Sequence, residues 1–590
     1  MSETKISFGK VFWPSLLASS IIALLIFLVV FLLIGGLFPE KPAYKVKQKS
    51  VLHMQLKGDI KENSKIEVNP TSLSIDKTLG LADILYGIGK AKSDPNIEGI
   101  FLEVNNLSCG YSSSSEIRNA LKDFQNSGKF IHAYNKGEVI TLKEYYLSSV
   151  ANTNYGFPSS MMEFGGLGVE LMYYKNMLDK LDVEMQVIRG KNNDFKSAVE
   201  PYFRSSMSDS SRLQTETLLT GIWNVVQSDI SLSRSIEKSL LKKIADSTLI
   251  RRASDAVKYD LLDGVKYRDE VLTEIANQLS IDKVEELSLV SFQEYAKKKF
   301  YSNQLINRSK KANVAVILAE GAIATEGADF TSKEIVNLFR KVRLNDDIKT
   351  VVFRVNSPGG SALASDEIWR EVKLTAAKKK VIVSMGDVAA SGGYYVSAPA
   401  HRIFAEKNTI TGSIGVFGVI PYTGALFENK IGITFDYVKT NPHAVLSLNK
   451  KLTKDEFTTI QQEVNFIYDE FLKRVAEGRS MTKENVNKIA RGRVWTGEDA
   501  LQIGLVDEIG GLTDALNYAI KEANIDKAII EYFPEKKTEP WEEIIENLNE
   551  EKSVNIKSSV PQELLEMYQK AKEIEGHTGI QMRGPAYIFK

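Results

Sequence analysis

Ser391 stands in a sequence context that can make a serine hydroxyl reactive. A β-branched run ends near Met385, a turn of small residues follows, and an apolar-aromatic stretch that predicts a helix begins near the serine. A hydroxyl at a helix N-terminus lies among free backbone N–H groups and the positive end of the helix dipole, which favour developing negative charge. The ordinary alternative is a serine that only caps the helix. Ser391 is therefore a candidate nucleophile that its local sequence does not distinguish from a cap.

Glycines near two predicted strand ends could stabilise the negative charge of an acyl-transfer reaction. Gly359 and Gly360 follow a predicted strand, and Gly392 directly follows the serine. Glycines present backbone N–H groups that no Cβ obstructs. The N–H of Gly392, with that of Gly359 or Gly360, could bind the oxyanion of a tetrahedral intermediate. An ordinary strand-to-helix turn is the alternative interpretation of the glycine pair.

A serine nucleophile needs a general base, for which the sequence offers a histidine or a lysine. None of the five histidines stands in a recognisable triad context, although His401 follows Ser391 closely and leaves Ser-His-Asp chemistry open. A lysine serves as the base when burial lowers the pKa of its amine from about 10.4 towards neutrality. Lys196 and Lys191 are equally basic candidates, and each taken alone is typical of a solvated surface lysine.

The chain contains two diverged copies of one unit, spaced by about 250 residues, a period too long for a solenoid repeat. Opposite residues 390–393 of the second copy, the first copy has Thr141 to Glu144, and it also lacks the glycine pair. Opposite Lys196, the second copy has residues 444–446 and no lysine. Only the second copy can therefore supply the nucleophile. The matching stretches are 51–58 with 314–321, 96–105 with 347–356, 145–148 with 394–397, and 255–264 with 499–508.

Strand and helix patterns alternate within each copy. In the second copy, β-branched runs at 314–318, 350–355 and 380–385 predict buried strands, and 333–343 and 364–377 predict helices with charged outer faces. This alternation predicts α/β domains with parallel sheets. We expect an N-terminal domain over 48–300 and a C-terminal domain over 310–527. The charged, less periodic residues 528–590 predict a peripheral tail with some helix.

One hydrophobic segment predicts a membrane anchor. No charged residue occurs between Lys10 and Glu40, and an apolar helix over 13–38, after a short segment 1–12, can cross a hydrocarbon core of roughly 30 Å. A buried globular helix is the alternative. The segment ends in Gly-Gly-Leu-Phe-Pro without an Ala-x-Ala-like site, which indicates an uncleaved anchor. Lysines flank it on both sides, so charge alone does not give the orientation.

Composition excludes several classes of function. The 75 basic and 75 acidic residues balance, so no global field attracts nucleic acid. The single cysteine, Cys109, excludes an intrachain disulfide and a Cys-rich zinc site. No histidines stand in a paired metal-ligand spacing, and we expect neither a metal nor a cofactor. The histidines are His53, His132, His401, His443 and His577.

The motifs in combination resemble the long, duplicated form of the signal peptide peptidase A (protease IV) family, over essentially the whole chain. The Asn-Ser-Pro-Gly-Gly element alone is shared with Clp proteases and crotonase-like proteins, so the combination carries the resemblance. The resemblance implies two tandem Clp/crotonase-like α/β domains after a transmembrane helix. The motifs are Asn356-Ser357-Pro358-Gly359-Gly360, Ala390-Ser391-Gly392-Gly393, Thr411-Gly412-Ser413-Ile414-Gly415 and Lys196-Ser197-Ala198-Val199-Glu200-Pro201.

The resemblance also implies roles and a setting. Ser391 would be the nucleophile, Lys196 rather than Lys191 the general base, and Ser413 the residue that orients the lysine amine. The oxyanion hole would come from Gly359, Gly360 and Gly392. The implied substrates are apolar peptides, especially signal peptides left in the membrane after export. The implied setting is the bacterial inner membrane, with a single span over 13–38, periplasmic catalytic domains and a homotetrameric assembly.

Two other classes of function compete with a peptidase. A crotonase-like acyl-CoA enzyme would share the fold, but it would need a carboxylate base and would gain nothing from a membrane anchor. A degenerate, non-catalytic membrane scaffold is the second alternative, since the first copy shows that the architecture survives without catalytic residues. The complementary retention of Ser391, Ser413 and Lys196 in different copies argues against the scaffold.

Overall fold

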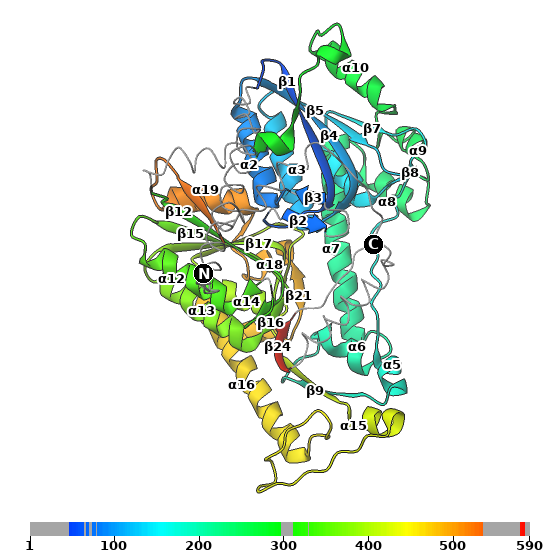
Figure 1. The fold of residues 1–590 in the computed structure, drawn as a ribbon. Helices are drawn as coiled ribbons and strands as arrows, with labels where there is room; N and C mark the ends of the chain where they lie inside the picture. Colours follow the sequence, from blue (N-terminus) through cyan, green and yellow to red (C-terminus); the bar gives the residue numbers. More distant parts are fainter. Residues whose placement is uncertain are drawn as a thin grey trace, which may run out of the picture. The chain divides into compact units, whose positions relative to one another are not determined.

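The computed structural model describes residues 46–63, 66–69, 74–77, 79–296, 311–328, 330–534 and 579–583. The described residues from Lys49 onward belong to one compact unit (Figure 1). Among the described residues, no helix is long and apolar enough to cross a membrane. The predicted anchor over 13–38 lies outside the described residues.

The first copy is built on a parallel sheet whose described strands run in the order β10-β7-β5-β4-β1-β11. Its central strand β4 is a long apolar run that is buried over most of its length. Helices α2 (Leu81–Ser93) and α3 (Tyr111–Gln125) pack against each other beside it. The strands are β1 (Ser50–Asp59), β4 (Ile97–Ser108), β5 (Phe130–Asn135), β7 (Thr153–Gly156), β10 (Gly264–Val265) and β11 (Leu289–Ser291).

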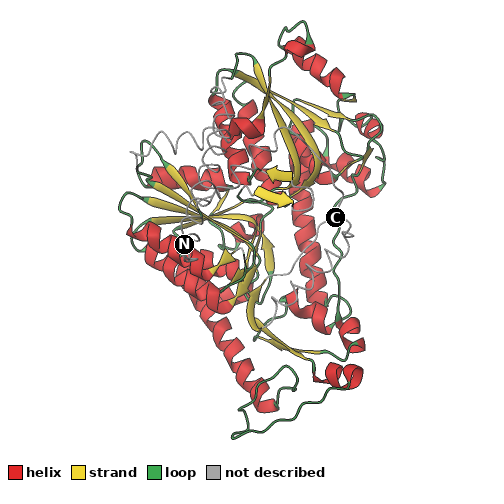
Figure 2. Ribbon diagram, in the orientation of Figure 1, coloured by secondary structure: helices red, strands yellow, loops and turns green. Residues whose placement is uncertain are grey.

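The second copy repeats this parallel sheet in the order β22 (Glu508–Ile509), β18 (Arg402–Ala405), β17, β15, β12 and β23. Strands β19 and β21 form a second branch from β17, in which β21 runs antiparallel to β19. The three predicted strands lie within β12, β15 and β17, and the two predicted helices coincide with α12 (Ser332–Leu344) and α13 (Ala362–Ala376). Figure 2 shows helices beside the strands of both sheets. The α/β class is therefore confirmed. The strands are β12 (Val314–Glu320), β15 (Thr350–Ser357), β17 (Lys380–Ala390), β19 (Ile410–Gly412), β21 (Val494–Thr496) and β23 (Ile530–Phe533).

Matching long helices show the duplication in the structure. Helix α7 (Asp209–Arg234) in the first copy and α16 (Lys454–Arg479) in the second are each 26 residues long. Side chains cap both N-termini, from Ser208 and Thr453, and both helices end at a serine in the left-handed conformation. Capping hydroxyls satisfy backbone N–H groups that the first helical turn leaves unpaired. The two copies therefore start and stop this helix by the same local chemistry.

A third sheet joins the two copies and runs β14-β13-β16-β24-β20-β9. Strand β9 comes from the first copy and pairs antiparallel with β20 of the second, from Phe417 opposite Arg189 to Tyr422 opposite Glu184. The pairing carries the chain after Arg189, with Lys196, onto the second copy. The strands are β9 (Glu184–Arg189), β13 (Ile323–Ala324), β14 (Phe330–Thr331), β16 (Gly359–Ser361), β20 (Phe417–Tyr422) and β24 (Gly579–Arg583).

Buried polar contacts also bind the copies together. The Arg354 guanidinium on β15, fully buried, lies 2.9 Å from the carboxylate of Glu62 and 2.6 Å from that of Glu116. Asp387 on β17 accepts hydrogen bonds from the N–H groups of Gly110 and Ser113 at the start of α3. Buried charges are tolerated when they are paired and hydrogen-bonded in this way. The interface thus fixes β15 and β17, the two strands that lead to the predicted site.

The segment after residue 527 takes part in the sheets at two places. Residues 530–533 form β23, which pairs in parallel with β12. Residues 579–583 form β24, which lies antiparallel between β16 and β20 (Figure 1). The charge and weak periodicity of these residues predicted a peripheral tail with some helix. The same features gave no indication of the two short strands. Residues 535–578 lie outside the described part of the chain.

Candidate active site

Strand β17 delivers Ser391 to the N-terminus of the short helix α14 (Gly392–Ser397). The Ser391 backbone is at φ 56° and ψ −113°, a region that residues with a Cβ seldom adopt. The Ser391 N–H donates to the Gly412 carbonyl over 2.8 Å, which helps to hold this turn. Its side chain makes no capping hydrogen bond to α14. The structure therefore places Ser391 at the helix start without using its hydroxyl as the cap.

Lys196 reaches this serine from the other copy. Its Nζ lies 2.8 Å from Ser391 Oγ, 2.9 Å from the Ser413 carbonyl oxygen and 3.0 Å from Ser413 Oγ. All three side chains are fully buried. The structure thus brings together the three residues that the sequence and the resemblance singled out, although two halves of the chain contribute them.

Burial governs the charge of the lysine amine. Removal from water lowers the pKa of Lys196 well below its ordinary value. Within the described residues, no carboxylate or imidazole is hydrogen-bonded to Lys196 or to Ser391. A neutral amine has two N–H donors and one lone pair. Its donors match the two oxygens of Ser413, and its lone pair is left to accept the hydroxyl proton of Ser391.

The loop that carries Lys196 is held against the second copy by backbone contacts. The Phe195 N–H donates to the Arg491 carbonyl over 3.0 Å. Gly492 adopts φ 80°, and a Cβ there would lie 2.6 Å from the Lys196 Cβ. Glycine is required at such a position, both for the positive φ and for the close approach. Gly492 could not be predicted from the sequence, because nothing in its local sequence indicates a neighbour almost three hundred positions away.

Ser413 occupies a second strained turn opposite the lysine. Its backbone is at φ 49°. Its N–H donates to the Arg493 carbonyl over 2.7 Å, and its Oγ lies 3.4 Å from the Gly492 carbonyl oxygen. The hydroxyl can therefore donate weakly to Gly492 while it accepts from the lysine amine. This geometry fits the orienting role that the resemblance implied.

The three predicted oxyanion glycines lie in two elements next to Ser391. Gly392 is the first residue of α14. Gly359 and Gly360 lie in β16, where the Gly359 N–H donates to Ser357 Oγ over 3.1 Å. A Cβ on Gly393 would lie 2.6 Å from the Ser357 carbonyl oxygen, so α14 and the end of β15 approach closely. The N–H of Gly359 must exchange its partner before it can bind an oxyanion.

The alternative bases lie away from the serine. Lys191 is exposed, and its backbone N–H donates to Asn465 Oδ1. His401 Nδ1 accepts from the Val381 N–H at the beginning of β17, whereas Ser391 follows the end of that strand. Ten residues of extended chain span about 30 Å. The structure therefore favours neither Lys191 nor His401 as a partner of Ser391.

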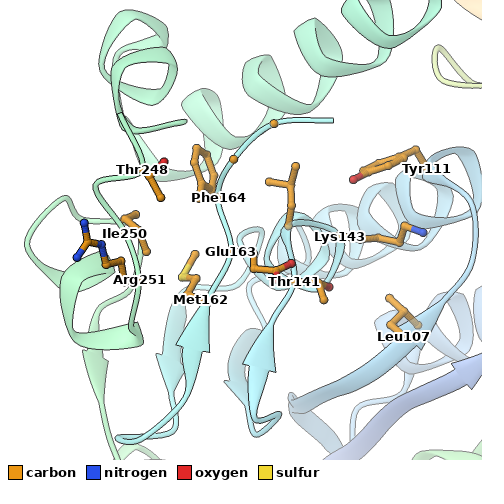
Figure 3. A pocket seen from close by; sticks show the side chains of 13 residues that line it. Leu107, Tyr111, Thr141, Lys143, Met162, Glu163, Phe164, Thr248, Ile250 and Arg251 are labelled. Atoms are coloured by element: carbon orange, nitrogen blue, oxygen red, sulfur yellow. The ribbon is translucent and has the colours of Figure 1, made fainter. Parts of the chain in front are cut away.

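The first copy keeps a cavity where the second copy has its buried site. Strands β6 (Val139–Ile140) and β8 (Met161–Met162) pair there as β17 and β19 pair in the second copy, with Val139 opposite Met161 and Val388 opposite Ile410. Continuing this register places Leu142 where Ser391 stands and Phe164 where Ser413 stands. The cavity measures about 690 Å³. Figure 3 shows side chains from its lining, among them Thr141, Met162, Phe164, Ile250 and Arg251.

Comparison with known proteins identifies the family. A model of peptidase family S49 matches residues 124–282 and 373–526. The chain belongs to peptidase family S49. The two S49 matches agree with the internal duplication, since Lys196 lies in the first and Ser391 in the second.

Relatives of this S49 chain match most of its length. Over 82% of the chain and 71% of the relative, it is 33% identical to the chloroplastic serine protease SPPA of Arabidopsis thaliana. Over 78% of the chain and 74% of the relative, it is 36% identical to protease 4 of Salmonella typhi. A putative signal peptide peptidase SppA of Enterococcus faecium is 32% identical over 40% of the chain and 72% of that protein. These matches confirm the resemblance to protease IV proteins that the motifs indicated.

Proposed function

We propose that this S49 protein is a serine endopeptidase with Ser391 as nucleophile and Lys196 as general base. The observation that carries the proposal is the buried Lys196 amine, 2.8 Å from the Ser391 hydroxyl oxygen and without a counter-charge among the groups bonded to it. A neutral amine at this distance can take the hydroxyl proton. Family S49 membership and the similarity to proteins named as proteases support peptide hydrolysis as the reaction.

Acylation proceeds in two steps on this geometry. Ser391 Oγ forms a bond to the peptide carbonyl carbon while its proton moves to Lys196 Nζ, and the carbonyl oxygen becomes an oxyanion. Gly392 and Gly359 or Gly360 donate N–H groups to that oxyanion, a contribution of about 10²–10³-fold for a donor of this kind. The C–N bond then breaks, and the Lys196 ammonium gives its proton to the departing amine.

Deacylation repeats the proton transfers with water. Lys196 takes a proton from water as the water oxygen attacks the acyl carbon. Ser391 Oγ then leaves and recovers a proton from Lys196. The two oxygens of Ser413 hold the amine in place throughout both halves of the reaction, since they accept its N–H groups. General base catalysis of this kind contributes about 10²–10⁴-fold.

Apolar peptides bound as extended strands are the proposed substrates. Strand β24 pairs antiparallel with both β16, which contains Gly359 and Gly360, and β20. Its placement supports a groove in which an extended chain is added to the sheet edge beside Ser391 by main-chain hydrogen bonds. Signal peptides, which are apolar, fit the name of the Enterococcus faecium relative. A peptide in this groove competes with β24 for the same strand edges.

The proposed setting is a membrane. We propose that residues 13–38 anchor the chain in the bacterial inner membrane as a single span, with the catalytic domains in the periplasm. The uncharged stretch between Lys10 and Glu40 supports the anchor. We also propose that each half has a Clp/crotonase-like fold, which the parallel sheets and the Gly-Gly turn support. An anchored enzyme would meet peptides that remain in the bilayer.

A homotetramer is the proposed assembly, and one exposed segment supports contact between chains. Residues 432–446 precede α16 as β9 precedes α7, yet they form neither helix nor strand. Val438 is 97% exposed, and Leu446 after it is 70% exposed. Exposed apolar side chains gathered in one segment are typical of a contact surface. In the first copy, the corresponding segment is β9, which pairs with the second copy. In an assembly, the exposed segment of the second copy would pack in a similar way against the first copy of a neighbouring chain.

Hydrolysis of a fluorogenic apolar peptide tests the proposed reaction. Wild-type protein should cleave the peptide, and Ser391→Ala should lose essentially all of that activity with an unchanged unfolding temperature. Ser397→Ala is a matched control, because Ser397 is equally buried at the end of the same helix. Equal activity of wild type and Ser391→Ala would overturn the proposal.

A further inference from the structure

Gln214 is a buried amide that uses both of its N–H donors and its carbonyl oxygen in hydrogen bonds next to the lysine loop. It lies on α7 and is 1% exposed. Its Nε2 donates to the Phe195 carbonyl over 3.0 Å and to Ser197 Oγ over 2.9 Å. Its Oε1 accepts from the Val494 N–H over 3.3 Å. A side-chain amide has two N–H donors and a carbonyl acceptor, and all of them are engaged here.

The two donor contacts hold the residues on either side of Lys196. Phe195 precedes the lysine and Ser197 follows it, so the Gln214 amide nitrogen donates a hydrogen bond to each neighbour of Lys196. Lys196 itself is in neither a strand nor a helix, since it directly precedes a short 3₁₀ turn over Ser197–Val199. A loop residue whose side chain has to meet an atom in another copy needs such external support.

The acceptor contact extends to the strand that anchors Ser413. Val494 is the first residue of β21 and stands opposite Gly412 of β19. The residue before it, Arg493, accepts the Ser413 N–H. The Gln214 amide therefore connects the backbone around Lys196 directly to the backbone around Ser413. These are the two residues whose separation fixes where the lysine amine lies.

Helix α7 is itself fixed against β21 at a second point. Gly221 is two helical turns after Gln214, and a Cβ there would lie 2.9 Å from the Thr496 Cγ2. Residues two turns apart share one face of a helix. Leu218, between them, and Val494 are members of the same buried apolar cluster. The helix is thus a rigid base from which Gln214 acts.

We propose that Gln214 is a positioning residue that sets the Lys196 amine on Ser391. This inference rests on the proposed function, since it assigns Gln214 no contact with substrate. The amide holds the lysine loop and the Ser413 strand at one spacing, so that the amine stays buried between Ser391 and Ser413. Loss of the amide lets the loop move and admits water to the amine. A shift of about 1 Å in a catalytic group can cost 10²-fold in rate.

Gln214→Met tests the proposal, because methionine keeps the length of the side chain and removes every hydrogen bond. The expected result is a fall in kcat of about 10²-fold with KM changed less than about twofold, since the substrate groove is untouched. The midpoint of the pH–kcat/KM profile should also move to higher pH, because a hydrated amine has a higher pKa. The matched control is Gln227→Met on the same helix, where the buried Nε2 has no hydrogen-bond partner among the described residues. Gln227→Met should retain the wild-type kcat and midpoint.

A second variant tests the proposal if Gln214→Met does not fold. Gln214→Glu has the same shape and keeps an acceptor for the Val494 N–H, but it loses the N–H donors to Phe195 and Ser197. It should also lower kcat and move the profile to higher pH. The proposal is overturned if Gln214→Met or Gln214→Glu folds and matches Gln227→Met in kcat and midpoint. Activity retained by Lys196→Met would instead show that Lys196 is not the base. Failure of the proposed function is thus distinguished from failure of the inference about Gln214.

Discussion

The Lys196 amine and the Ser391 hydroxyl meet at 2.8 Å although the two residues are 195 positions apart in the chain. The contact exists because β9 leaves the first copy and pairs with β20 of the second, which carries the following loop to the end of β17. Each copy has kept one of the two groups. The two copies therefore contribute different catalytic groups, and neither copy holds a complete site.

The activity of the protein should rise with pH through the pKa of Lys196. The amine is the base only when it is neutral, and burial lowers its pKa. The pH dependence of kcat/KM reports this group in the free enzyme. We expect a single ascending limb with a midpoint below the ordinary lysine value. A profile that is flat from about pH 6 to pH 10 would exclude a titrating lysine base.

The stability of the protein should show the cost of burying the lysine. The unfolded chain binds a proton at Lys196 that the folded chain releases, so the free energy of unfolding rises with pH between the depressed folded pKa and about 10.4. Relative to Lys196→Met, wild type should gain up to about 1.4 kcal/mol per pH unit within that window. Urea unfolding of both proteins at several pH values measures the difference. A difference that does not vary with pH would mean that the folded lysine stays charged.

Gly492→Ala should impair catalysis more than a glycine substitution with the same backbone cost. The new Cβ would lie 2.6 Å from the Lys196 Cβ and would displace the lysine. We expect a fall in kcat on the order of 10²-fold. Gly128→Ala is the matched control, since Gly128 adopts φ 87° and a Cβ there meets no described atom within 4 Å. If both variants reduce kcat equally, the effect comes from backbone strain and not from the lysine.

Charge placed in the exposed apolar segment of the second copy should weaken the assembly. Val438→Asp and Leu446→Asp would put a carboxylate on the surface proposed to contact a neighbouring chain, where burial of an unpaired charge is costly. Light scattering after size-exclusion chromatography should show smaller species than wild type. Leu232→Asp is the control, because Leu232 is 75% exposed on α7 and outside this segment. Unchanged mass for all three variants would place the contact surface elsewhere.

The sequence predicted the parts of the fold that local patterns encode. The β-branched runs of the second copy lie within β12, β15 and β17, because a strand buried on both faces needs a continuous apolar sequence. The charged residues after 527 concealed β23 and β24. A short edge or bridging strand takes its stability from partners distant in sequence, so its own residues carry little signal.

The sequence also located the main site residues but not their supports. Ser391 and Lys196 stand out because each has lost its counterpart in the other copy. Gln214 has no such mark, since a glutamine in a helix is ordinary and its three partners come from two other segments. Gly492 is similar, because only the close approach of Lys196 requires a glycine there. Supports of this kind depend on tertiary contacts, which a single sequence does not list.

The most direct test of the split site is to compare Lys196→Met with Lys191→Met. Lys191 is exposed in the same loop region and serves as the matched control. Peptide hydrolysis and labelling of Ser391 by a fluorophosphonate would be measured on folded, equally assembled proteins. We predict that Lys191→Met behaves as wild type and that Lys196→Met loses turnover by at least about 10²-fold, with labelling of Ser391 slowed in parallel. Wild-type turnover in Lys196→Met, or its loss in Lys191→Met alone, would contradict the assignment of Lys196 as the base.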